Sequence, residues 1–560
     1  MKNFTVTVLD TTGIQSYIFG SNRLRENIGA SYLVSQATDN WARDALNKLK
    51  TDIQQEVYAF DPDQHQPEAK PHIKDGGLAA ELIYAGGGNT VLLFSDQKYA
   101  VKFTQILSKR ILEEAPGINL VAVHREFDWD SQSLYEEIQD VMKNDLDIKK
   151  RSRIPSAPLL GLGVTATCRS TQLVAVGMSE KFEDDEPYLI SREIKAKLKV
   201  VPKANDKLQE MFTTSLGSYE FPLRTDKMGR SEGDSSYVAV VHADGNGMGK
   251  RFQEFGKDKS NPDYIIAMRE LSHSVNQAGI NALKTVIEIL VQSIQTDENG
   301  KKKVKGYFEI KDNYLPFRPL VYGGDDVAFV CDGRLGLELA AIFLQEFEKQ
   351  PVVGNEDGKN PLTACAGICV VKTHYPFARA YQMSEDLCRK SKKFVKDKEG
   401  DFSALDWHLA ASGLSGSISE IRDREYRLKI PDFKEVASLE MRPVSLRKQQ
   451  NSDWRTWEGF TKVVKHFNED EDWKGRRNKV IALREVLREG MDATEKFIKN
   501  YRIKDEQLPL FPEFSDQSLA KKGWLNGICG YFDAIEAMEF YISLKEESDA
   551  NLPSENKTAQ

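Results

Sequence analysis

Three acidic residues, in two separate parts of the chain, have the type and setting of a metal-dependent nucleotidyl-transfer site. Asp244 follows the apolar stretch YVAVVHA, and Asp325 and Asp326 lie within LVYGGDDVAFV. Joining a hydroxyl to a nucleotide phosphate requires divalent metal ions that activate the attacking oxygen and neutralise the leaving pyrophosphate. Carboxylates are the ligands that Mg²⁺ prefers. We therefore predict that Asp244, Asp325 and Asp326 are the catalytic, metal-binding groups, with Mg²⁺ or Mn²⁺ as the cofactor.

A glycine-rich segment directly follows Asp244 and is suited to binding phosphates. Its glycines allow backbone N–H groups to approach a triphosphate at the start of a helix, where the helix dipole also favours anions. A Gly-Gly-Asp-Asp sequence by itself is also compatible with an ordinary hairpin turn, so the nearby strand-terminal acid decides between the two interpretations. The predicted nucleotide contacts are Gly245, Asn246, Gly247, Met248, Gly249 and Lys250, with Gly323 and Gly324 shaping the acidic turn.

A helical pattern over residues 376–396 ends in a lysine cluster. Lys392 and Lys393 are predicted to reach phosphates across the site, although a solvated basic helix end fits the same pattern. Asp406 and His408 in ALDWH are predicted to have a core or ribose-contacting role, because metal activation of the hydroxyl makes a histidine base unnecessary.

The elements that position these residues occur twice. Residues 4–9 and 237–242 read as apolar strands, and each is followed by a helical pattern and then by a glycine-rich hairpin, at 82–94 and 320–330. This repetition predicts a duplicated α+β module. The first hairpin has no acid, so it is predicted either to cradle an acceptor nucleotide or to be a purely structural duplicate. Its turn reads Gly86, Gly87, Gly88 and Asn89.

The predicted fold class is α+β, with two ferredoxin-like palm domains of the GGDEF/cyclase-like kind, a small inserted α/β domain and a C-terminal helical bundle. The expected boundaries are a degenerate palm-like domain at 1–150, an inserted domain at 151–230, a palm domain with the acidic turn at 231–446, a helical domain at 447–547 and a disordered tail at 548–560.

Composition narrows the function classes. The chain has 560 residues and a formal net charge of −8, which argues against a protein that coats nucleic acid by itself. Its six cysteines include no CxxC pair, so neither a disulfide framework nor a zinc site is expected. No apolar run reaches the roughly 18 residues that a membrane span needs, and no signal peptide is recognisable at the start. A cytoplasmic protein without a membrane partner is expected.

Several motifs, in this order, resemble a known family. DTTGIQSYIFGSNRLRENIGASYLV, AGGGN, HADGNGMGKRF, YGGDDVAFV, SALDWH and LEMRPVSL are similar to the large palm-domain subunit of type III CRISPR effector complexes, known as Cas ten. The resemblance implies an enzyme of antiviral defence that converts ATP into cyclic oligoadenylates. It also implies partners: other type III effector subunits, including a small helical one, and guide and target RNA bound through the complex.

The sequence departs from this family in three respects. No His-Asp dipeptide of the family's nuclease domain is found, the inserted segment keeps only Cys168 of the expected zinc cysteines, and Asn246 stands where many relatives have a second acid. DNA cleavage and zinc binding are therefore not expected. Two alternatives remain open: a noncatalytic scaffold subunit of a type III complex, and a cyclase that makes a cyclic dinucleotide.

Overall fold

The structure of the protein is a computed structural model. The residues that the structure describes are 3–67, 72–86, 88–152, 161–229, 236–355, 360–410, 416–448, 453–512, 514 and 517–545. The expected disordered tail at 548–560 and Gly87 of the first hairpin lie outside these ranges. No helix within the described residues is long and apolar enough to cross a membrane.

The first unit is an α+β domain with the ferredoxin-like order β-α-β-β-α-β. β1 (Asn3–Thr12) lies at the centre and pairs antiparallel with β4 (Asn89–Phe94) and β5 (Asn119–Asp128). The sheet order is β2-β3-β4-β1-β5. The remaining elements are α1 (Ile14–Phe19), α2 (Leu24–Thr38), α3 (Asn40–Ile53), β2 (Glu56–Tyr58), a 3₁₀ turn (Ile73–Asp75), β3 (Leu78–Gly86), α4 (Gln97–Glu114), α5 (Leu134–Asp140), a π-helical turn (Val141–Asp145) and α6 (Leu146–Ser152).

The second unit repeats this topology. β8 (Tyr237–Gly245) pairs antiparallel with β13 (Asp326–Asp332) and β14 (Ala364–Lys372), and the sheet order is β12-β13-β8-β14-β15-β18. The predicted duplication and the α+β fold class are thereby confirmed. Its other elements are α9 (Met248–Gly256), α10 (Asn261–Gln292), β9 (Ile294–Thr296), β10 (Lys302–Val304), β11 (Phe308–Glu309), β12 (Phe317–Val321), α11 (Gly336–Glu348), α12 (Phe377–Asp397), β15 (Ala404–Ala410), α13 (Ile418–Glu425) and β18 (Val444–Ser445).

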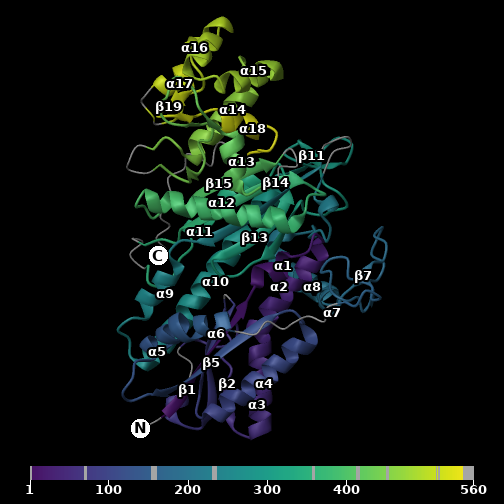
Figure 1. Cartoon of the computed structure of the whole chain (residues 1–560), viewed down its shortest axis with the longest axis vertical. Helices are drawn as coiled ribbons and strands as arrows, with labels where there is room; N and C mark the ends of the chain where they lie inside the picture. Colours follow the sequence, from purple (N-terminus) through teal and green to yellow (C-terminus); the bar gives the residue numbers. More distant parts are fainter. Residues whose placement is uncertain are drawn as a thin grey trace.

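Two further parts flank these units (Figure 1). Between the units are β6 (Gly177–Met178), β7 (Leu189–Ile190), α7 (Arg192–Lys199), α8 (Val201–Leu216) and a 3₁₀ turn (Thr225–Lys227). After them, the C-terminal part is helical, as predicted, but it also shares a four-stranded sheet with the second unit, in the order β16-β17-β20-β19. Its elements are β16 (Arg427–Leu428), β17 (Ala437–Ser438), α14 (Trp457–Glu469), α15 (Arg477–Leu487), α16 (Met491–Asn500), a 3₁₀ turn (Lys504–Glu506), α17 (Ser518–Lys522), β19 (Trp524–Leu525), β20 (Ile528–Cys529) and α18 (Phe532–Ala537).

The two units pack against each other reciprocally. Helix α2 of the first unit contacts β12 of the second, and α10 of the second contacts β3 of the first. The hydroxyl of Ser31 on α2 donates to the carbonyl of Leu320, and the fully buried Arg269 on α10 donates to the carbonyl of Leu82 at 2.8 Å. Figure 1 shows the first unit at the bottom, the second in the middle and the C-terminal helices at the top. The two glycine-rich hairpins therefore share one interface.

Candidate functional site

The acids of the second unit meet at the end of two paired strands. β8 and β13 lie side by side, and their register places Asp244 directly opposite Asp326. Asp325 precedes β13, and its carbonyl accepts a hydrogen bond from the amide of Gly245 at 3.1 Å. The strands thus bring together acids that are about 80 residues apart in the sequence. Paired strands lie only about 5 Å apart, so even short side chains on them are close.

Glycines make this close approach possible. A Cβ at Gly245 would lie 2.7 Å from the Cβ of Asp325, so a larger residue would push the two strand ends apart. Gly323 and Gly324 have φ values of +116° and +80°, which L-residues with side chains rarely adopt. A Cβ at Gly279 on α10 would lie 2.3 Å from the carbonyl oxygen of Gly324. The acidic turn is therefore seated directly on helix α10.

The electrostatics of the site show crowded negative charge. Burial and the neighbouring Asp244 and Asp325 raise the pKa of Asp326 to about 7, and burial together with Asp244 also raises the pKa of Asp325. The Asp326 side chain is 43% exposed, but its Oδ1 atom is buried and has no hydrogen-bond partner. Like charges that approach this closely favour either protonation or a bound cation.

Lys392 on α12 supplies a cation at this site. Its ammonium group lies 2.6 Å from Oδ2 of Asp244 and 2.8 Å from the carbonyl oxygen of Gly245. Burial alone would lower the pKa of Lys392, but Asp244 outweighs that effect and raises it. Lys393, predicted alongside it, has an exposed side chain. Of the two lysines, only Lys392 is in contact with an acid of the site.

The donor set partly fits a divalent metal. Carboxylate oxygens suit Mg²⁺ or Mn²⁺, and the unpartnered Oδ1 of Asp326 is an oxygen that a cation could bind. Among the described residues, however, no three His, Cys, Asp or Glu side chains form a ready metal-binding cluster. Asp244 is paired with Lys392, so this lysine would have to release the carboxylate for Asp244 to hold a metal.

The residues that follow Asp244, which were predicted to contact the nucleotide, differ in their surroundings. The amide group of Asn246 donates to Thr363 Oγ1 and to the carbonyl of Phe402, both at 3.1 Å, and so fastens the strand end to neighbouring segments. Met248 is buried, and Lys250 lies 3.5 Å from Glu254 with a side chain that is 78% exposed. Gly247 begins α9 with a φ of +64°. Gly249 has open space around its Cα, which leaves room for a ligand at the helix start.

The first unit carries a counterpart that the sequence analysis missed. In its sheet Asp10 lies opposite Asn89, in the register that Asp244 and Asp326 occupy in the second unit. Lys150 on α6 forms an ion pair with Asp10, as Lys392 does with Asp244. The signal was present in the sequence, because DTTG and ADGNG both follow the first strand of a repeat. The first unit thus keeps one acid and one lysine but not the acidic turn.

The hairpin of the first unit lies close to the second unit. A Cβ at Gly86 would lie 3.5 Å from Oγ of Ser272, which belongs to the helix that also supports the acidic turn. Gly88 has a φ of +83°, and its carbonyl accepts a hydrogen bond from the amide of Thr11 at 3.2 Å. Gly88 therefore lies in a conformation that restricts side chains, whereas Gly86 is at ordinary contact distance from the second unit.

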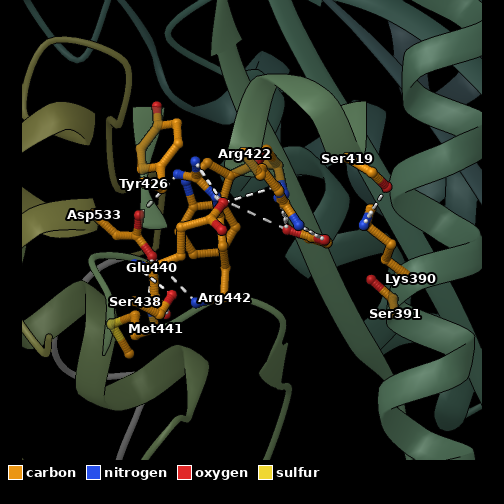
Figure 2. Close-up of polar contacts among 12 residues, drawn as sticks. Lys390, Ser391, Ser419, Arg422, Tyr426, Ser438, Glu440, Met441, Arg442 and Asp533 are labelled. Carbon is orange, nitrogen blue, oxygen red and sulfur yellow. Dashed lines mark hydrogen bonds and ion pairs between the residues drawn. The ribbon is translucent and has the colours of Figure 1, made fainter. Parts of the chain in front are cut away.

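Asp406 and His408 prove to be core residues. Both are fully buried, and Asp406 accepts two hydrogen bonds from Arg422, at 2.6 and 2.8 Å. Arg422 belongs to a buried network with Glu440, Arg442 and Asp533, in which Asp533 comes from the C-terminal helix α18 (Figure 2). Of the two roles predicted for these residues, the core role is the one that the structure supports. The network joins the second unit to the C-terminal helices.

Taken together, a duplicated ferredoxin-like fold with paired acids at a strand end and an adjacent hairpin turn defines a palm-type domain. Residues 237–400 match the family model for Cas10/Cmr2, second palm domain. Over these residues the chain is therefore similar to the second palm domain of Cas10/Cmr2 proteins. All three acids, the glycine-rich segment and Lys392 lie within the matched residues.

Solved structures give a more distant likeness along the whole chain. A Csm1–Csm4 cassette in complex with cA4 is 13% identical, with a TM-score of 0.48, and the alignment covers 96% of this chain and 69% of that one. A Csm1–Csm4 cassette in complex with AMPPNP is 13% identical, with a TM-score of 0.49 and coverages of 96% and 70%. Csm1 from T. onnurineus has the same identity and coverages, with a TM-score of 0.48. No curated protein matches the sequence.

Proposed function

We propose that the chain is a metal-dependent nucleotidyltransferase that joins ATP into cyclic oligoadenylates as a subunit of a type III CRISPR complex. The observation that supports this most directly is the pairing of Asp244 with Asp326 across β8 and β13, next to Asp325. The match of residues 237–400 to the Cas10/Cmr2 second palm domain supports the same assignment. The choice of ATP and of a cyclic product comes from the resemblance of the sequence motifs.

In the proposed reaction, the 3′-hydroxyl of one nucleotide attacks the α-phosphorus of another and pyrophosphate leaves. A divalent metal, when bound, would lower the pKa of the hydroxyl and neutralise charge on the phosphates. Asp244, Asp325 and Asp326 would hold it. Lys392, which binds Asp244 in this structure, would be available to bind a phosphate oxygen. Gly247 and Gly249 at the start of α9 leave the backbone N–H groups open to the triphosphate.

The first unit is proposed to hold the acceptor nucleotide. Its turn lies against the helix that supports the acidic turn, through Gly86 and Ser272. It lacks the second acid, because Asn89 stands opposite Asp10. An asparagine in that place can bind a ribose or a base by hydrogen bonds, but it adds no negative charge that would attract a metal ion to the first unit.

A second candidate function is a noncatalytic scaffold. The ion pair between Lys392 and Asp244 favours it, because a lysine already neutralises the acid that a metal would need. Under this hypothesis the acids have no chemical role, and the domain serves only to organise partner subunits in the complex. The enzyme predicts a product that removal of the acids abolishes, whereas the scaffold predicts no product with or without them.

The deciding experiment supplies the purified protein with its partner subunits, guide RNA and target RNA, and measures pyrophosphate release from ATP with Mg²⁺ or Mn²⁺. Parallel reactions with GTP alone, and mass spectrometry of products from mixed triphosphates, distinguish an oligoadenylate from a guanine-based dinucleotide. The variant Asp325→Ala with Asp326→Ala is expected to assemble normally and release no pyrophosphate. Activity equal to the wild type in that variant would overturn the proposal, and an assembled wild-type complex without product would favour the scaffold.

A further inference from the structure

A series of polar contacts, buried in its middle, runs from the first unit to the acidic site of the second. Tyr381 on α12 donates its hydroxyl hydrogen to Oε1 of Gln15 on α1, at 2.5 Å. The same hydroxyl oxygen lies 3.3 Å from Nδ1 of His242 on β8. That nitrogen also lies 3.5 Å from the buried Oδ1 of Asp326. Four side chains from both units therefore connect end to end.

The direction of the hydrogen bonds follows from the available donors. Because Tyr381 gives its only hydrogen to Gln15, the Nδ1 atom of His242 has to carry the hydrogen that faces Tyr381. The same nitrogen lies 3.5 Å from Oδ1 of Asp326, a buried atom that has no hydrogen-bond partner, so its N–H is placed to face this oxygen. His242 can therefore hold the orientation of this carboxylate, in the way that residues around a metal site orient its ligands.

Packing buries and restricts the two middle residues of this series, His242 and Tyr381. His242 is 5% exposed and Tyr381 is 3% exposed. The ring of Tyr381 stacks on Phe19 of α1 with centroids 3.5 Å apart. Side chains that are buried and stacked in this way have few alternative rotamers. A shift of α1 would therefore move Tyr381, and through it His242, instead of being absorbed by loose side chains.

The first residue of this series of polar contacts, Gln15, lies close to the glycine turn of the first unit. Gln15 belongs to the helix that begins at Ile14, and a Cβ at Gly88 would lie 2.9 Å from Cδ1 of Ile14. The amide and the hydroxyl of Thr11 both donate to the carbonyl of Gly88, at 3.2 and 3.4 Å. The end of β1 and the start of α1 are therefore in direct contact with the glycine turn.

We propose that Gln15, Tyr381 and His242 are positioning residues that orient Asp326 and transmit the conformation of the first unit's glycine turn to it. This inference rests on the proposed function, because it concerns the same acidic site. It adds a series of contacts through which the conformation of the first unit's glycine turn determines the orientation of the Asp326 carboxylate. None of the three residues has to touch a nucleotide for this role.

The test measures Mn²⁺ binding to the purified full chain by electron paramagnetic resonance, which requires no turnover. Tyr381→Phe keeps the stacked ring and removes the hydroxyl, and we expect about a 10-fold loss of Mn²⁺ affinity, the lower end of the effect of residues that orient metal ligands. Tyr375→Phe is the matched control, because the Tyr375 hydroxyl accepts from Arg379 at 2.9 Å and does not contact the site. Equal Mn²⁺ affinity in Tyr381→Phe and the wild type would overturn the proposal.

Two further variants separate positioning from stability. His242→Asn keeps an N–H donor close to the place of Nδ1 and should restore most of the affinity that His242→Phe loses. Gln15→Ala should weaken Mn²⁺ binding severalfold, and Gln15→Ala combined with Tyr381→Phe should be no weaker than Tyr381→Phe alone, since residues in one chain are not additive. Additive losses of Mn²⁺ affinity in the double variant would refute the proposed positioning role. Equal Mn²⁺ affinities of the two His242 variants would refute it as well.

The outcomes distinguish this inference from the proposed function. In one outcome, the wild type binds Mn²⁺ and the variants lose affinity as expected, while the assembled complex releases no pyrophosphate. That result would support the positioning role of the three residues and refute the enzymatic function. Pyrophosphate release by the wild type with unchanged Mn²⁺ binding in Tyr381→Phe would do the reverse. A wild-type chain that binds no Mn²⁺ would refute both.

Discussion

The replacement Asp326→Asn tests the crowding of acids at the strand end. Opposed residues on antiparallel strands place their side chains about 5 Å apart. At an effective dielectric constant of about 20, two unit charges at that distance repel by about 3 kcal/mol. Because the Asp326 side chain is 43% exposed and Lys392 neutralises Asp244, solvent and the lysine reduce this to about 1 kcal/mol. A full rise of the pKa of Asp326 from about 3.9 to about 7 would correspond to about 4 kcal/mol, and the exposure of its side chain reduces this figure as well. Removing the charge should therefore stabilise the metal-free protein by at least about 1 kcal/mol, and each kcal/mol corresponds to about 2–4 °C in the unfolding midpoint of a domain of this size.

The effect should depend on pH with a definite sign. Because the folded state raises the pKa of Asp326 to about 7, the folded protein holds its proton where the unfolded chain, with a pKa of about 3.9, has lost it. Wild-type stability should therefore fall between pH about 4 and 7, and Asp326→Asn should lack this fall. The advantage of the variant should be near zero at pH 4 and complete above pH 7.

Thermal unfolding in EDTA at several pH values measures this difference, with Asp184→Asn on an exposed segment as the control for loss of one charge. Added Mg²⁺ should raise the wild-type midpoint more than that of Asp326→Asn, since a ligand of the folded state stabilises it. A variant that is less stable than the wild type above pH 7, or one that gains as much from Mg²⁺, would refute the account of repelling carboxylates.

Three other predictions follow from single contacts. Lys392→Met frees Asp244 from its ion pair and should raise Mn²⁺ affinity in the absence of nucleotide by about 5-fold, the equivalent of about 1 kcal/mol; unchanged affinity in a Mn²⁺ titration would contradict this. Gly279→Val should displace the acidic turn, because a Cβ there meets the carbonyl oxygen of Gly324, and should cut pyrophosphate release at least 10-fold while Lys284→Ala on the same helix does not. Arg442→Met leaves Asp533 and Glu440 buried without their shared cation and should destabilise the protein by about 3–5 kcal/mol in urea unfolding; a loss below 1 kcal/mol would show that the acids are neutral in the fold.

The repeated strand, helix and hairpin pattern was enough to predict the duplicated fold. The short sheet beside the C-terminal helices was not predicted, because its strands have only two residues each and leave no periodic signal. Residues 237–242 were predicted as a strand, but β8 continues to Gly245. The reason is that Asp244 is held by its partners on both sides, Asp326 and Cys365, and pairing outweighs local propensity.

The acids of the site could be predicted because their sequence context is local. Tyr381, His242 and Gln15 could not, since their relation depends on how α1 and α12 pack between the units, and no spacing in the sequence records that packing. Asp10 was within reach, as it follows the first strand in the same way as Asp244. The hairpin of the first unit has no acid, however, so its sequence does not indicate the register that Asp10 shares with Asp244.

The opposition of Asp10 to Asn89 gives the proposed reaction a direction. The two units have the same arrangement of strands and face each other, but only the second carries a pair of acids. A phosphate can therefore be activated only on the side of the second unit. The nucleotide on the other side can offer a hydroxyl but cannot be the one that loses pyrophosphate at that moment. Each new bond would then form with the same polarity, and the growing chain would have to move across the interface before the next addition.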